Sequence, residues 1–337
     1  MSYFIFGGTG FIGTHLTNLL HEVHPEAKIY NLDIIEPGTP LPTVKNYKPA
    51  LRKGEEHAAT FIYCDVRQTI ELEKVNITPE DVIFNFAAVH RTPGHPDPAY
   101  FETNIRGAEN VCAFAERHGI RKIVFTSSIA PYGAAEELKE ETTLPTPNTP
   151  YGISKLVAEK IHVAWQAGSP ERQLTIVRPG VVFGRGENGN FTRLYWGIRG
   201  HKFMYPGRKD TIKACIYVKE LVRFMLYRLE HHDSGVELYN CCYEPAYTIE
   251  HIVESMKRVT NMKVKVPFMP GWLIMTAAGI AGALGSPMGI CPARVRKLQI
   301  STNICGKKLA ASGYRFRYTF EEALADWYKD NGNLYLQ

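Results

Sequence analysis

The chain has 337 residues, of which 45% are hydrophobic and 22% charged, an ordinary composition for a folded protein with one large or two interlocked domains. Its formal net charge is +5, and basic and acidic residues alternate along the chain, which argues against a nucleic-acid partner and suits an anionic substrate. Seven cysteines without a CxxC pair predict reduced core residues of a cytoplasmic protein, not a disulfide framework or a zinc site.

Neither a targeting segment nor a membrane span is expected. The strand-like run SYFIFG begins at residue 2 and leaves no room for a signal peptide. No run of 18 or more apolar residues occurs, so no segment is expected to cross a bilayer.

Short apolar runs alternate with helical patterns through the first half of the chain. The clearest helical pattern covers residues 98–119 and ends on Gly119, as a C-cap would. Apolar strands separated by helices predict a parallel sheet covered on both faces, and right-handed crossovers make it a doubly wound α/β (Rossmann) domain. Residues 34–58 are predicted to form a surface loop. The predicted strands are residues 2–7, 28–33, 60–65, 82–88, 122–127 and 174–179.

The alternation weakens after about residue 179. The glycine-rich run GRGENGN at 184–190 and the segments beyond 241 indicate a smaller α/β lobe at the carboxyl edge of the sheet, where ligands of open α/β sheets bind. We assign the chain to two units, the Rossmann domain being residues 1–178 and 208–240 and the substrate-binding lobe residues 179–207 and 241–337.

A glycine motif, GGTGFIG at 7–13, directly follows the first predicted strand. It satisfies GxGxxG through Gly8, Gly10 and Gly13, and GxxGxxG through Gly7, Gly10 and Gly13. These glycines permit a tight turn, close approach of the backbone to a pyrophosphate and close packing of the next helix. The positive end of that helix would then face the phosphates. Taken alone, the motif also fits a simple tight turn.

Two aspartates at strand ends strengthen the dinucleotide interpretation. Asp33 ends the second predicted strand twenty residues after Gly13, where a carboxylate would bind ribose hydroxyls. Because that carboxylate would repel a 2′-phosphate, NAD is preferred to NADP. Asp65 closes the third strand and could reach the adenine. The alternative for each is a turn residue at the end of a strand.

The run TPYGISK places Tyr151 and Lys155 one helical turn apart, so their side chains would share a helix face. An ammonium beside a phenol favours the phenolate, which could act as a base. The same spacing recurs at Tyr205–Lys209, but a proline and a glycine lie between the two residues and make a shared helix face improbable. Ser128 ends the fifth strand and could hydrogen-bond the substrate oxygen that Tyr151 deprotonates, while Lys155 holds the cofactor ribose.

Together these runs resemble the extended short-chain dehydrogenase/reductase family over nearly the whole chain, through GGTGFIG, CDV, NFAA, ETNIRGAENV, VFTSSIAPYG, YGISK, IVRPGVVFG and YVKEL. Family members of this kind are mostly sugar-nucleotide epimerases, dehydratases and ketoreductases. The resemblance implies NAD and no metal. It also implies cofactor contacts from Gly7, Gly10, Phe11, Ile12, Gly13, Asp33, Asp65, Val66, Ala87, Ala88, Asn104, Tyr151, Lys155 and Pro179.

Departures from the family pattern narrow the choice of reaction and carrier. Dehydratases carry an Asp-Glu pair where this chain has Ile129 and Ala130, so the acid and base that eliminate water are missing. Epimerases of the UDP-galactose type have an arginine on the substrate diphosphate where this chain has Lys213, a point charge in place of a bidentate fork. A later arginine of those epimerases has no clear equivalent here.

A closer resemblance is to a bacterial subgroup that epimerises N-acetylglucosamine on undecaprenyl diphosphate for O-antigen assembly, through AAVHR, GHKFMYPG and ARVRKLQIST. His90 and Arg91 in the first of these runs would face the substrate. The apolar segment 270–286 is followed by Arg294, Arg296 and Lys297, a combination that suits peripheral contact with an anionic bilayer at the inner membrane face. A buried helix of the smaller lobe or a dimer contact explains that segment equally well.

The sequence therefore predicts an NAD-dependent 4-epimerase of a diphosphate-linked hexose, of the N-acetylglucosamine/N-acetylgalactosamine type, forming a homodimer. Its catalytic residues are Ser128, Tyr151 and Lys155, and its substrate-binding residues are His90, Arg91, Ser128 and Lys213. The carrier could be UDP or undecaprenyl diphosphate. Two alternatives remain open at this point, a 4-ketoreductase that consumes reduced cofactor and a non-catalytic dinucleotide sensor, although a sensor would need none of the three catalytic residues.

Overall fold

A seven-stranded sheet forms the centre of the computed structural model, which describes residues 1–40, 46–90, 95–133, 135–233, 235–273, 276 and 299–337. Its strand order is β12-β7-β5-β4-β1-β2-β3, and every neighbouring pair is parallel. All six predicted strands lie in this sheet, and the predicted doubly wound fold is confirmed. The seventh strand, β12, was not predicted. The strands are β1 (Ser2–Phe6), β2 (Lys28–Asp33), β3 (Thr60–Tyr63), β4 (Val82–Asn85), β5 (Lys122–Thr126), β7 (Gln173–Pro179) and β12 (Val236–Cys241).

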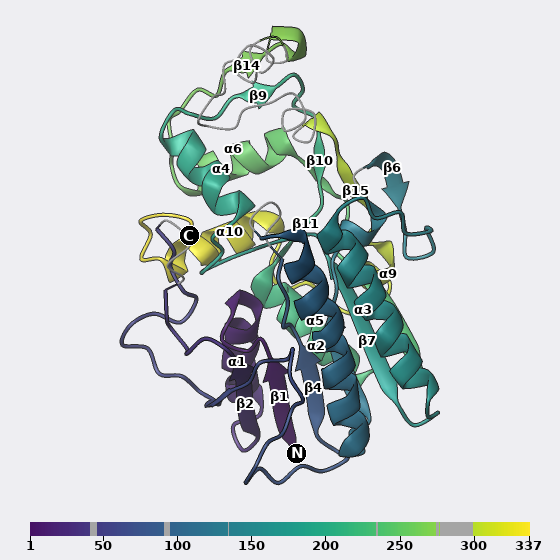
Figure 1. Ribbon diagram of the computed structural model, residues 1–337. Helices are drawn as coiled ribbons and strands as arrows, with labels where there is room; N and C mark the ends of the chain where they lie inside the picture. Colours follow the sequence, from purple (N-terminus) through teal and green to yellow (C-terminus); the bar gives the residue numbers. More distant parts are fainter. Residues whose placement is uncertain (41–45, 91–94, 134, 234, 274–275, 277–298) are drawn as a thin grey trace.

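Helices cover both faces of this sheet, which explains its continuous apolar strands. All five residues of β1 are buried. Tyr3 and Ile5 pack in one core cluster with side chains of α1 (Phe11–Val23) and α5 (Val218–Glu230). Phe4 and Phe6, which point to the opposite face, pack with α2 (Asp97–Arg117) and α3 (Pro150–Ala167), which lie side by side in Figure 1. Alternate residues of one strand thus serve two cores.

Local signals set the ends of α2 and α3. Gly119 follows α2 with φ +67°, and its N–H donates to the carbonyl of Glu116, so the predicted C-terminal glycine is confirmed. At the start of α3, the side chain of Thr149 accepts a hydrogen bond of 3.1 Å from the N–H of Gly152, and Pro150 occupies the first helical position. This cap places Tyr151 in the first turn of the helix.

Smaller sheets and helices lie beyond the carboxyl ends of the central strands (Figure 1). A four-stranded sheet has the order β13-β10-β15-β6, and the pairs β11-β8 and β14-β9 complete the described strands. These elements are β6 (Ala135–Lys139), β8 (Val181–Phe183), β9 (Tyr205–Pro206), β10 (Ile212–Lys213), β11 (Cys215–Tyr217), β13 (Tyr247–Thr248), β14 (Phe268–Met269), β15 (Thr302–Ile304), η1 (Ala130–Tyr132), α4 (Asn190–Arg199), α6 (Ile249–Val259), α9 (Lys307–Ala310) and α10 (Phe320–Asp330).

The four-stranded sheet combines both of the units predicted from the sequence. β6 and β10 come from the residues assigned to the Rossmann domain, whereas β13 and β15 come from the predicted lobe. The chain therefore passes between the central sheet and the four-stranded sheet more often than the predicted boundaries imply.

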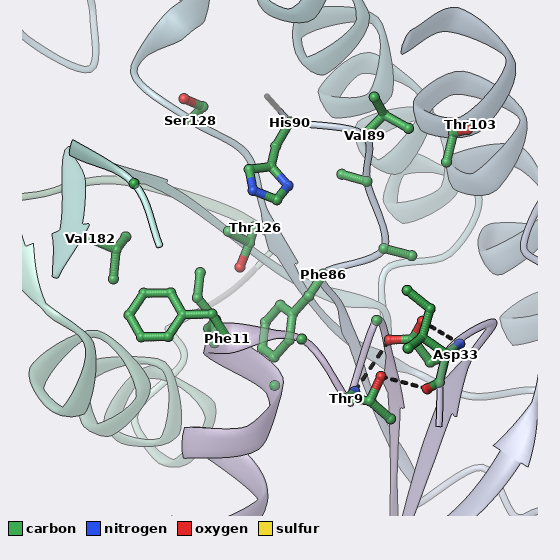
Figure 2. Close-up of a pocket in the computed structure, with 18 of the residues that line it drawn as sticks. Thr9, Phe11, Asp33, Phe86, Val89, His90, Thr103, Thr126, Ser128 and Val182 are labelled. Atoms are coloured by element: carbon green, nitrogen blue, oxygen red, sulfur yellow. Dashed lines mark hydrogen bonds between the residues drawn. The ribbon is translucent and has the colours of Figure 1, made fainter. Parts of the chain in front are cut away.

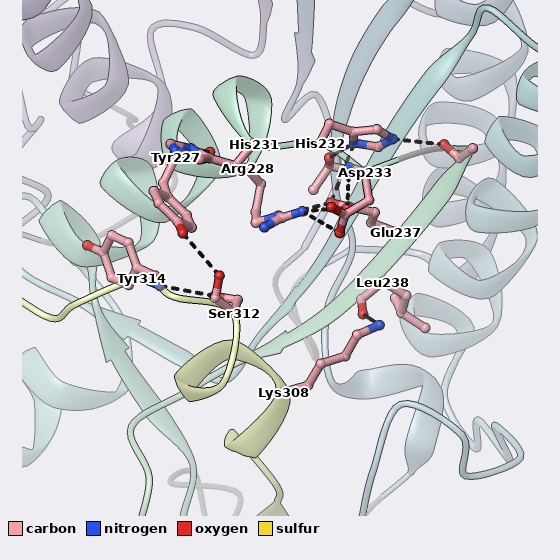
Figure 3. Close-up of polar contacts among 12 residues, drawn as sticks. Tyr227, Arg228, His231, His232, Asp233, Glu237, Leu238, Lys308, Ser312 and Tyr314 are labelled. Atoms are coloured by element: carbon pink, nitrogen blue, oxygen red, sulfur yellow. Dashed lines mark hydrogen bonds and ion pairs between the residues drawn. The ribbon is translucent and has the colours of Figure 1, made fainter.

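A buried polar cluster links the edge strand β12 to the C-terminal end of α5 (Figure 3). Arg228 donates through Nη2 and Nε to the Glu237 carboxylate, at 2.5 and 3.0 Å, and both side chains are buried. Nearby, the Tyr227 hydroxyl donates to the Ser312 carbonyl at 3.0 Å. This cluster joins the helix, the edge strand and a segment near the C-terminus.

The described cysteines have free thiols, and five of them are buried, as expected of reduced core residues; Cys291 lies outside the described residues. Within the described part of the chain, no helix is long and apolar enough to cross a membrane.

Candidate active site

A cavity of about 910 Å³ extends along the carboxyl ends of the strands of the central sheet. Its wall includes residues that end or directly follow those strands, among them Gly7, Asp33, Phe86, Thr126 and Pro179. In Figure 2, Asp33 and Thr9 lie at one side of the cavity and Ser128 at the other, with His90 and Thr126 between them. This is the edge at which the sequence predicted a ligand.

The glycine motif forms the turn between β1 and α1. Gly7 has φ +76°, and a Cβ there would lie 2.7 Å from the backbone nitrogen of Ala87. A Cβ on Gly13 would lie 2.5 Å from the carbonyl oxygen of Gly8, so any side chain would push α1 away from the strand. α1 begins at Phe11 without a side-chain cap, and its first turn lines the cavity. These uncapped N–H groups and the positive helix end fit the pyrophosphate of a dinucleotide.

Asp33 is held rigidly at the end of β2. Its carboxylate accepts hydrogen bonds from the backbone N–H groups of Thr9 at 3.2 Å and Ile34 at 2.8 Å. Burial raises the pKa of Asp33, and these hydrogen bonds oppose the rise. Asp65 also lines the cavity, but its carboxylate forms an ion pair of 2.6 Å with Arg67, which lowers the pKa of Asp65. Of these two aspartates, Asp33 is therefore the one that forms no ion pair with the described residues.

Ser128, Tyr151 and Lys155 line the same cavity, as predicted. Burial raises the pKa of Tyr151 to about 12, although a hydrogen bond with Ser128 opposes this. Burial also lowers the pKa of Lys155 to about 7, against the attraction of Glu159. The ammonium of Lys155 donates to the carbonyl of Thr126 at 2.6 Å. In the protein alone, the lysine therefore gives up its proton before the tyrosine does.

A buried ion pair supports α3 one turn beyond Lys155. Arg178 donates two hydrogen bonds to the Glu159 carboxylate, at 2.8 and 2.6 Å, and each side chain is only 4% exposed. Ser127 donates to the same carboxylate at 2.5 Å. This arrangement locks the ends of β5 and β7 to α3 and fixes the position from which Lys155 enters the cavity.

Most of the other predicted residues also lie on the cavity wall. These are Gly10, Phe11, Ile12, Gly13, Val66, Ala87, Ala88, His90 and Pro179. Arg91 lies outside the described residues.

Two predicted residues, Asn104 and Lys213, do not line the cavity. The Asn104 side chain accepts from the N–H of Val89 at 2.8 Å and donates to Ser154 at 2.8 Å, so it supports the loop after β4 from behind. Lys213 lies in the four-stranded sheet and donates to the carbonyl of Ile300 at 2.8 Å. The sequence motifs placed both residues near the site but could not show which way their side chains turn.

A cationic residue that sequence reasoning missed, Arg193, lies on the cavity wall. It belongs to α4 and donates to the side chain of Asn190 at 2.8 Å. The preceding residues 186–190 also line the cavity. The glycine-rich run at 184–190 was the available signal, because it marked a loop at the sheet edge just before this helix.

The fold and the cavity define a dinucleotide-binding α/β protein in which a serine, a tyrosine and a lysine line the same cavity as the glycine turn. The model of the NAD dependent epimerase/dehydratase family matches residues 3–242, and the chain belongs to this family. Its cofactor is accordingly NAD, which the glycine turn and Asp33 fit.

Named relatives and solved structures agree with this membership. The chain is 30% identical to the N-acetyl-alpha-D-glucosaminyl-diphospho-ditrans,octacis-undecaprenol 4-epimerase of Escherichia coli O157:H7, over 95% of this chain and 92% of the relative. It is 31% identical to a UDP-glucose 4-epimerase of Lacticaseibacillus casei, over 80% and 85%. The solved UDP-glucuronic acid 4-epimerase of Bacillus cereus in complex with NAD shares the fold, with a TM-score of 0.73, 18% identity and coverage of 99% and 100%.

Proposed function

We propose that this protein is an NAD-dependent 4-epimerase that interconverts the N-acetylglucosamine and N-acetylgalactosamine forms of a diphosphate-linked sugar. The observation that carries the proposal is that Ser128, Tyr151 and Lys155 line the same cavity as the glycine turn and Asp33. We take these three residues to be the acid–base group that acts beside the dinucleotide site. The relatives named as 4-epimerases support the reaction, and the E. coli relative supports the N-acetylated sugar.

In the proposed mechanism, the chain orients the sugar and moves one proton. When bound, NAD would supply reversible hydride transfer at C4 of the sugar, so that the reaction would pass through a 4-keto sugar that can be reduced from its other face. Tyr151 Oη takes the proton of the C4 hydroxyl and later gives it back. The Ser128 hydroxyl donates a hydrogen bond to the same sugar oxygen. The backbone of the glycine turn would hold the pyrophosphate, and Asp33 the ribose hydroxyls.

Tyr151 and Lys155 act as a pair that shares one proton. A neutral phenol beside a neutral amine holds the same number of protons as a phenolate beside an ammonium, so the two forms interconvert without exchange with solvent. The second form is the active base. Since the pKa of Lys155 is about 7 and that of Tyr151 about 12, the pair loses its first proton near neutral pH.

The cation that we assign to the substrate diphosphate is Arg193. Among the described residues on the cavity wall, the other cationic side chains are Arg67, which is paired with Asp65, and Lys155, which belongs to the catalytic group. The guanidinium of Arg193 could bind phosphate oxygens in a bidentate manner. His90, also on the wall, remains our candidate for contact with the sugar.

The test of the reaction is to incubate the purified protein with UDP-N-acetylglucosamine and, separately, with its undecaprenyl-diphosphate counterpart, without added cofactor. We expect the N-acetylgalactosamine form to accumulate to an equilibrium mixture, because each turnover restores the NAD that it uses. A product that forms only when reduced cofactor is supplied in stoichiometric amounts would identify a 4-ketoreductase and contradict the epimerase.

We further propose that the carrier is undecaprenyl diphosphate, that the enzyme works at the cytoplasmic face of the inner membrane, and that its product enters surface-polysaccharide (O-antigen) synthesis. The full-length likeness to the E. coli relative supports this. So do the exposed apolar side chains Phe268, Trp272 and Leu273, with Trp272 71% exposed, since such a patch suits an interfacial contact. Most of the apolar segment predicted to continue this surface lies outside the described residues.

The carrier is tested by sedimentation with anionic liposomes and by comparing turnover of the two substrates. We expect the wild-type protein to bind liposomes, and replacement of Trp272 and Leu273 by serine to reduce binding while NAD affinity is unchanged. Leu144→Ser is the matched control, because Leu144 is equally apolar and 79% exposed elsewhere. A wild-type protein that ignores liposomes and prefers the UDP-sugar would refute the lipid carrier but leave the 4-epimerase standing.

We also propose a homodimer. On α3, Ile153 and Val157 are exposed one helical turn apart, at 40% and 37%, and an apolar pair on one helix face suits a contact with a second copy. Light scattering should report a dimer for the wild type and a monomer for the double aspartate variant at these positions. A wild-type monomer at micromolar concentration would contradict this.

A further inference from the structure

A second cavity, of about 400 Å³, lies between α1, α5 and the segment that leads into α10. It shares no lining residue with the cofactor cavity. Its wall is dominated by ionisable side chains. Four of these are the cations Arg185, Lys219, Arg223 and Arg317.

Two of these cations are already neutralised within the protein. Lys219 forms ion pairs with Asp326 at 2.6 Å and Asp330 at 2.8 Å. Arg185 is paired with the carboxylate of Glu55. The positive charges of Lys219 and Arg185 are therefore already balanced by carboxylates of the protein.

The other two cations, Arg223 and Arg317, have no such partner. Their guanidinium groups form no ion pair with the described part of the chain, and Nε of Arg223 is buried without a hydrogen-bond partner there. The nearest acid along α5 is Glu220, whose attraction reaches Arg223. However, the Glu220 carboxylate already accepts from the Tyr314 hydroxyl and from the backbone N–H groups of Arg317 and Tyr318. A buried guanidinium nitrogen without a hydrogen-bond partner, such as Nε of Arg223, is costly unless something binds it.

The remaining ionisable groups on the wall do not cancel this charge. His15 donates through Nε2 to the carbonyl of Arg185 at 2.8 Å, and burial lowers the pKa of His15 to about 4, so it is neutral near pH 7. Glu22 is the one acid on the described wall that forms no ion pair, and it is exposed at the rim. The cavity thus presents two unpaired guanidinium groups against one solvated carboxylate.

We propose that this second cavity binds a small phosphate-bearing anion, held by the guanidinium groups of Arg223 and Arg317. A phosphate group offers several oxygens to two planar donor forks, which is the geometry that arginine recognises best. The volume is sufficient for a phosphate group carrying a small organic residue. Free phosphate and a phosphomonoester share this chemistry, so both are used as probes.

The experiment measures calorimetric binding of inorganic phosphate and of glucose 1-phosphate to NAD-saturated protein, with sodium chloride at equal ionic strength as the reference. We expect Arg317→Gln, which changes an exposed side chain and should fold normally, and Arg223→Gln each to weaken binding about tenfold or more. Glu22→Gln should tighten it, because the one unpaired carboxylate is removed. Tighter binding of glucose 1-phosphate would identify a phosphomonoester as the ligand, and equal binding would identify phosphate alone.

Two further variants decide where any bound anion lies. Arg315→Gln changes an exposed arginine of the same segment that does not line the cavity, and we expect it to bind as the wild type does. Arg193→Gln removes the cation of the cofactor cavity and should also leave binding unchanged. Loss of binding in Arg193→Gln but not in Arg317→Gln, or no phosphate binding above the chloride reference, would overturn the proposal.

Discussion

Tyr151 and Tyr205 are each followed four residues later by a lysine, yet the structure places them in different surroundings. Tyr151 lies in the first turn of α3, on the cavity wall with Lys155. Tyr205 lies in β9, and the glycine that follows at 207 has φ +84°, so the chain turns away from a helical path. The lysine reaches the Tyr205 ring only as a cation 5.1 Å from its centre. A four-residue spacing therefore brings the two side chains onto one face only where the segment is helical.

We predict that Tyr151→Phe lowers kcat by about 10²–10⁴-fold with little change in NAD affinity, because only the proton-transferring hydroxyl is removed. Rapid-quench assays and cofactor titration would measure the two effects. Tyr205→Phe is the control, since the Tyr205 hydroxyl is buried without a partner among the described residues. Equal loss of activity in the two variants would mean that Tyr151 is not the acid–base group.

The pH dependence follows from the shared proton. Below a pH of about 7 the pair is fully protonated and contains no base, because the pKa of Lys155 is about 7 and that of Tyr151 about 12. We expect kcat/KM to rise about tenfold per pH unit on the acid side and to level off above about pH 7. A profile that is flat from pH 5 to 8 would contradict the assignment.

Asp33 should determine the choice between NAD and NADP. Its carboxylate is fixed by Thr9 and Ile34 and cannot turn away from a 2′-phosphate. A like-charge contact of this kind costs about 1–4 kcal/mol, so Asp33→Arg should weaken NAD and reduce discrimination against NADP by roughly tenfold or more. Fluorescence titration with both reduced cofactors measures this. Equal affinity of the wild type for the two would disprove the role of Asp33.

At the scale of secondary-structure elements, the strands and helices with a strong local pattern could be predicted, and β12 could not. The sequence of β12, VELYNC, contains a glutamate and an asparagine, which look like surface residues. Both are buried, Glu237 because Arg228 reaches it from α5. No local pattern reveals a partner that folding brings across a helix–strand turn.

Because this pair is buried, we predict that Arg228→Met lowers the free energy of unfolding by about 3–5 kcal/mol, as it leaves the Glu237 carboxylate without its cation. Replacing both residues, by methionine and leucine, should cost less than the single change. Arg121→Gln is the control; its ion pairs with Glu80 and Glu171 are exposed, and its loss should cost about 1 kcal/mol or less. Denaturation by urea measures all three.

The residues of the site also divide into those that could be placed from the sequence and those that could not. Residues at the ends of strands, such as Asp33 and Ser128, could be placed at the sheet edge because parallel strands all end there. Asn104 and Lys213 could not be placed correctly, since their side chains turn toward protein carbonyls and hydroxyls. Arg193 was missed because its helix reaches the cavity only through tertiary packing.

At the scale of the whole molecule, three segments that are far apart in the sequence meet at the cavity rim. Asn188 lines the cavity, and its side chain accepts from the N–H of Lys48 at 2.9 Å and donates to the Lys48 carbonyl at 2.8 Å. Gln337 Nε2 donates to Asn188 at 3.2 Å and to the carbonyl of Asn46 at 2.7 Å. Residues 46–48 and Gln337 thus hold the loop that contains Asn188 in place at the cofactor cavity.

We predict that Asn188→Ala speeds release of NAD by about 3–30-fold, because two or more hydrogen bonds of roughly 0.5–1.5 kcal/mol each are lost from the rim. Gln337→Ala should have a smaller effect in the same direction. Gln68→Ala, an exposed residue outside the cavity wall, is the control. Stopped-flow displacement of the cofactor provides the rates, and unchanged release from Asn188→Ala would show that the rim does not retain it.

The pairing of β6 with β15 has a consequence for the order in which the protein matures on the ribosome. Six of the seven central strands have been synthesised once the chain reaches Pro179, together with most of the residues that surround the glycine turn. β6 must wait for a partner far downstream, since Ser301 bonds to Glu136 across a separation of 165 residues. Because contacts so distant in sequence form late, we expect the nucleotide half of the site to assemble while the nascent chain is still growing. The substrate half closes only once β15 is available to pair with β6, and pulse-labelled hydrogen exchange during refolding should show amides of β1 and β4 protected before those of β15.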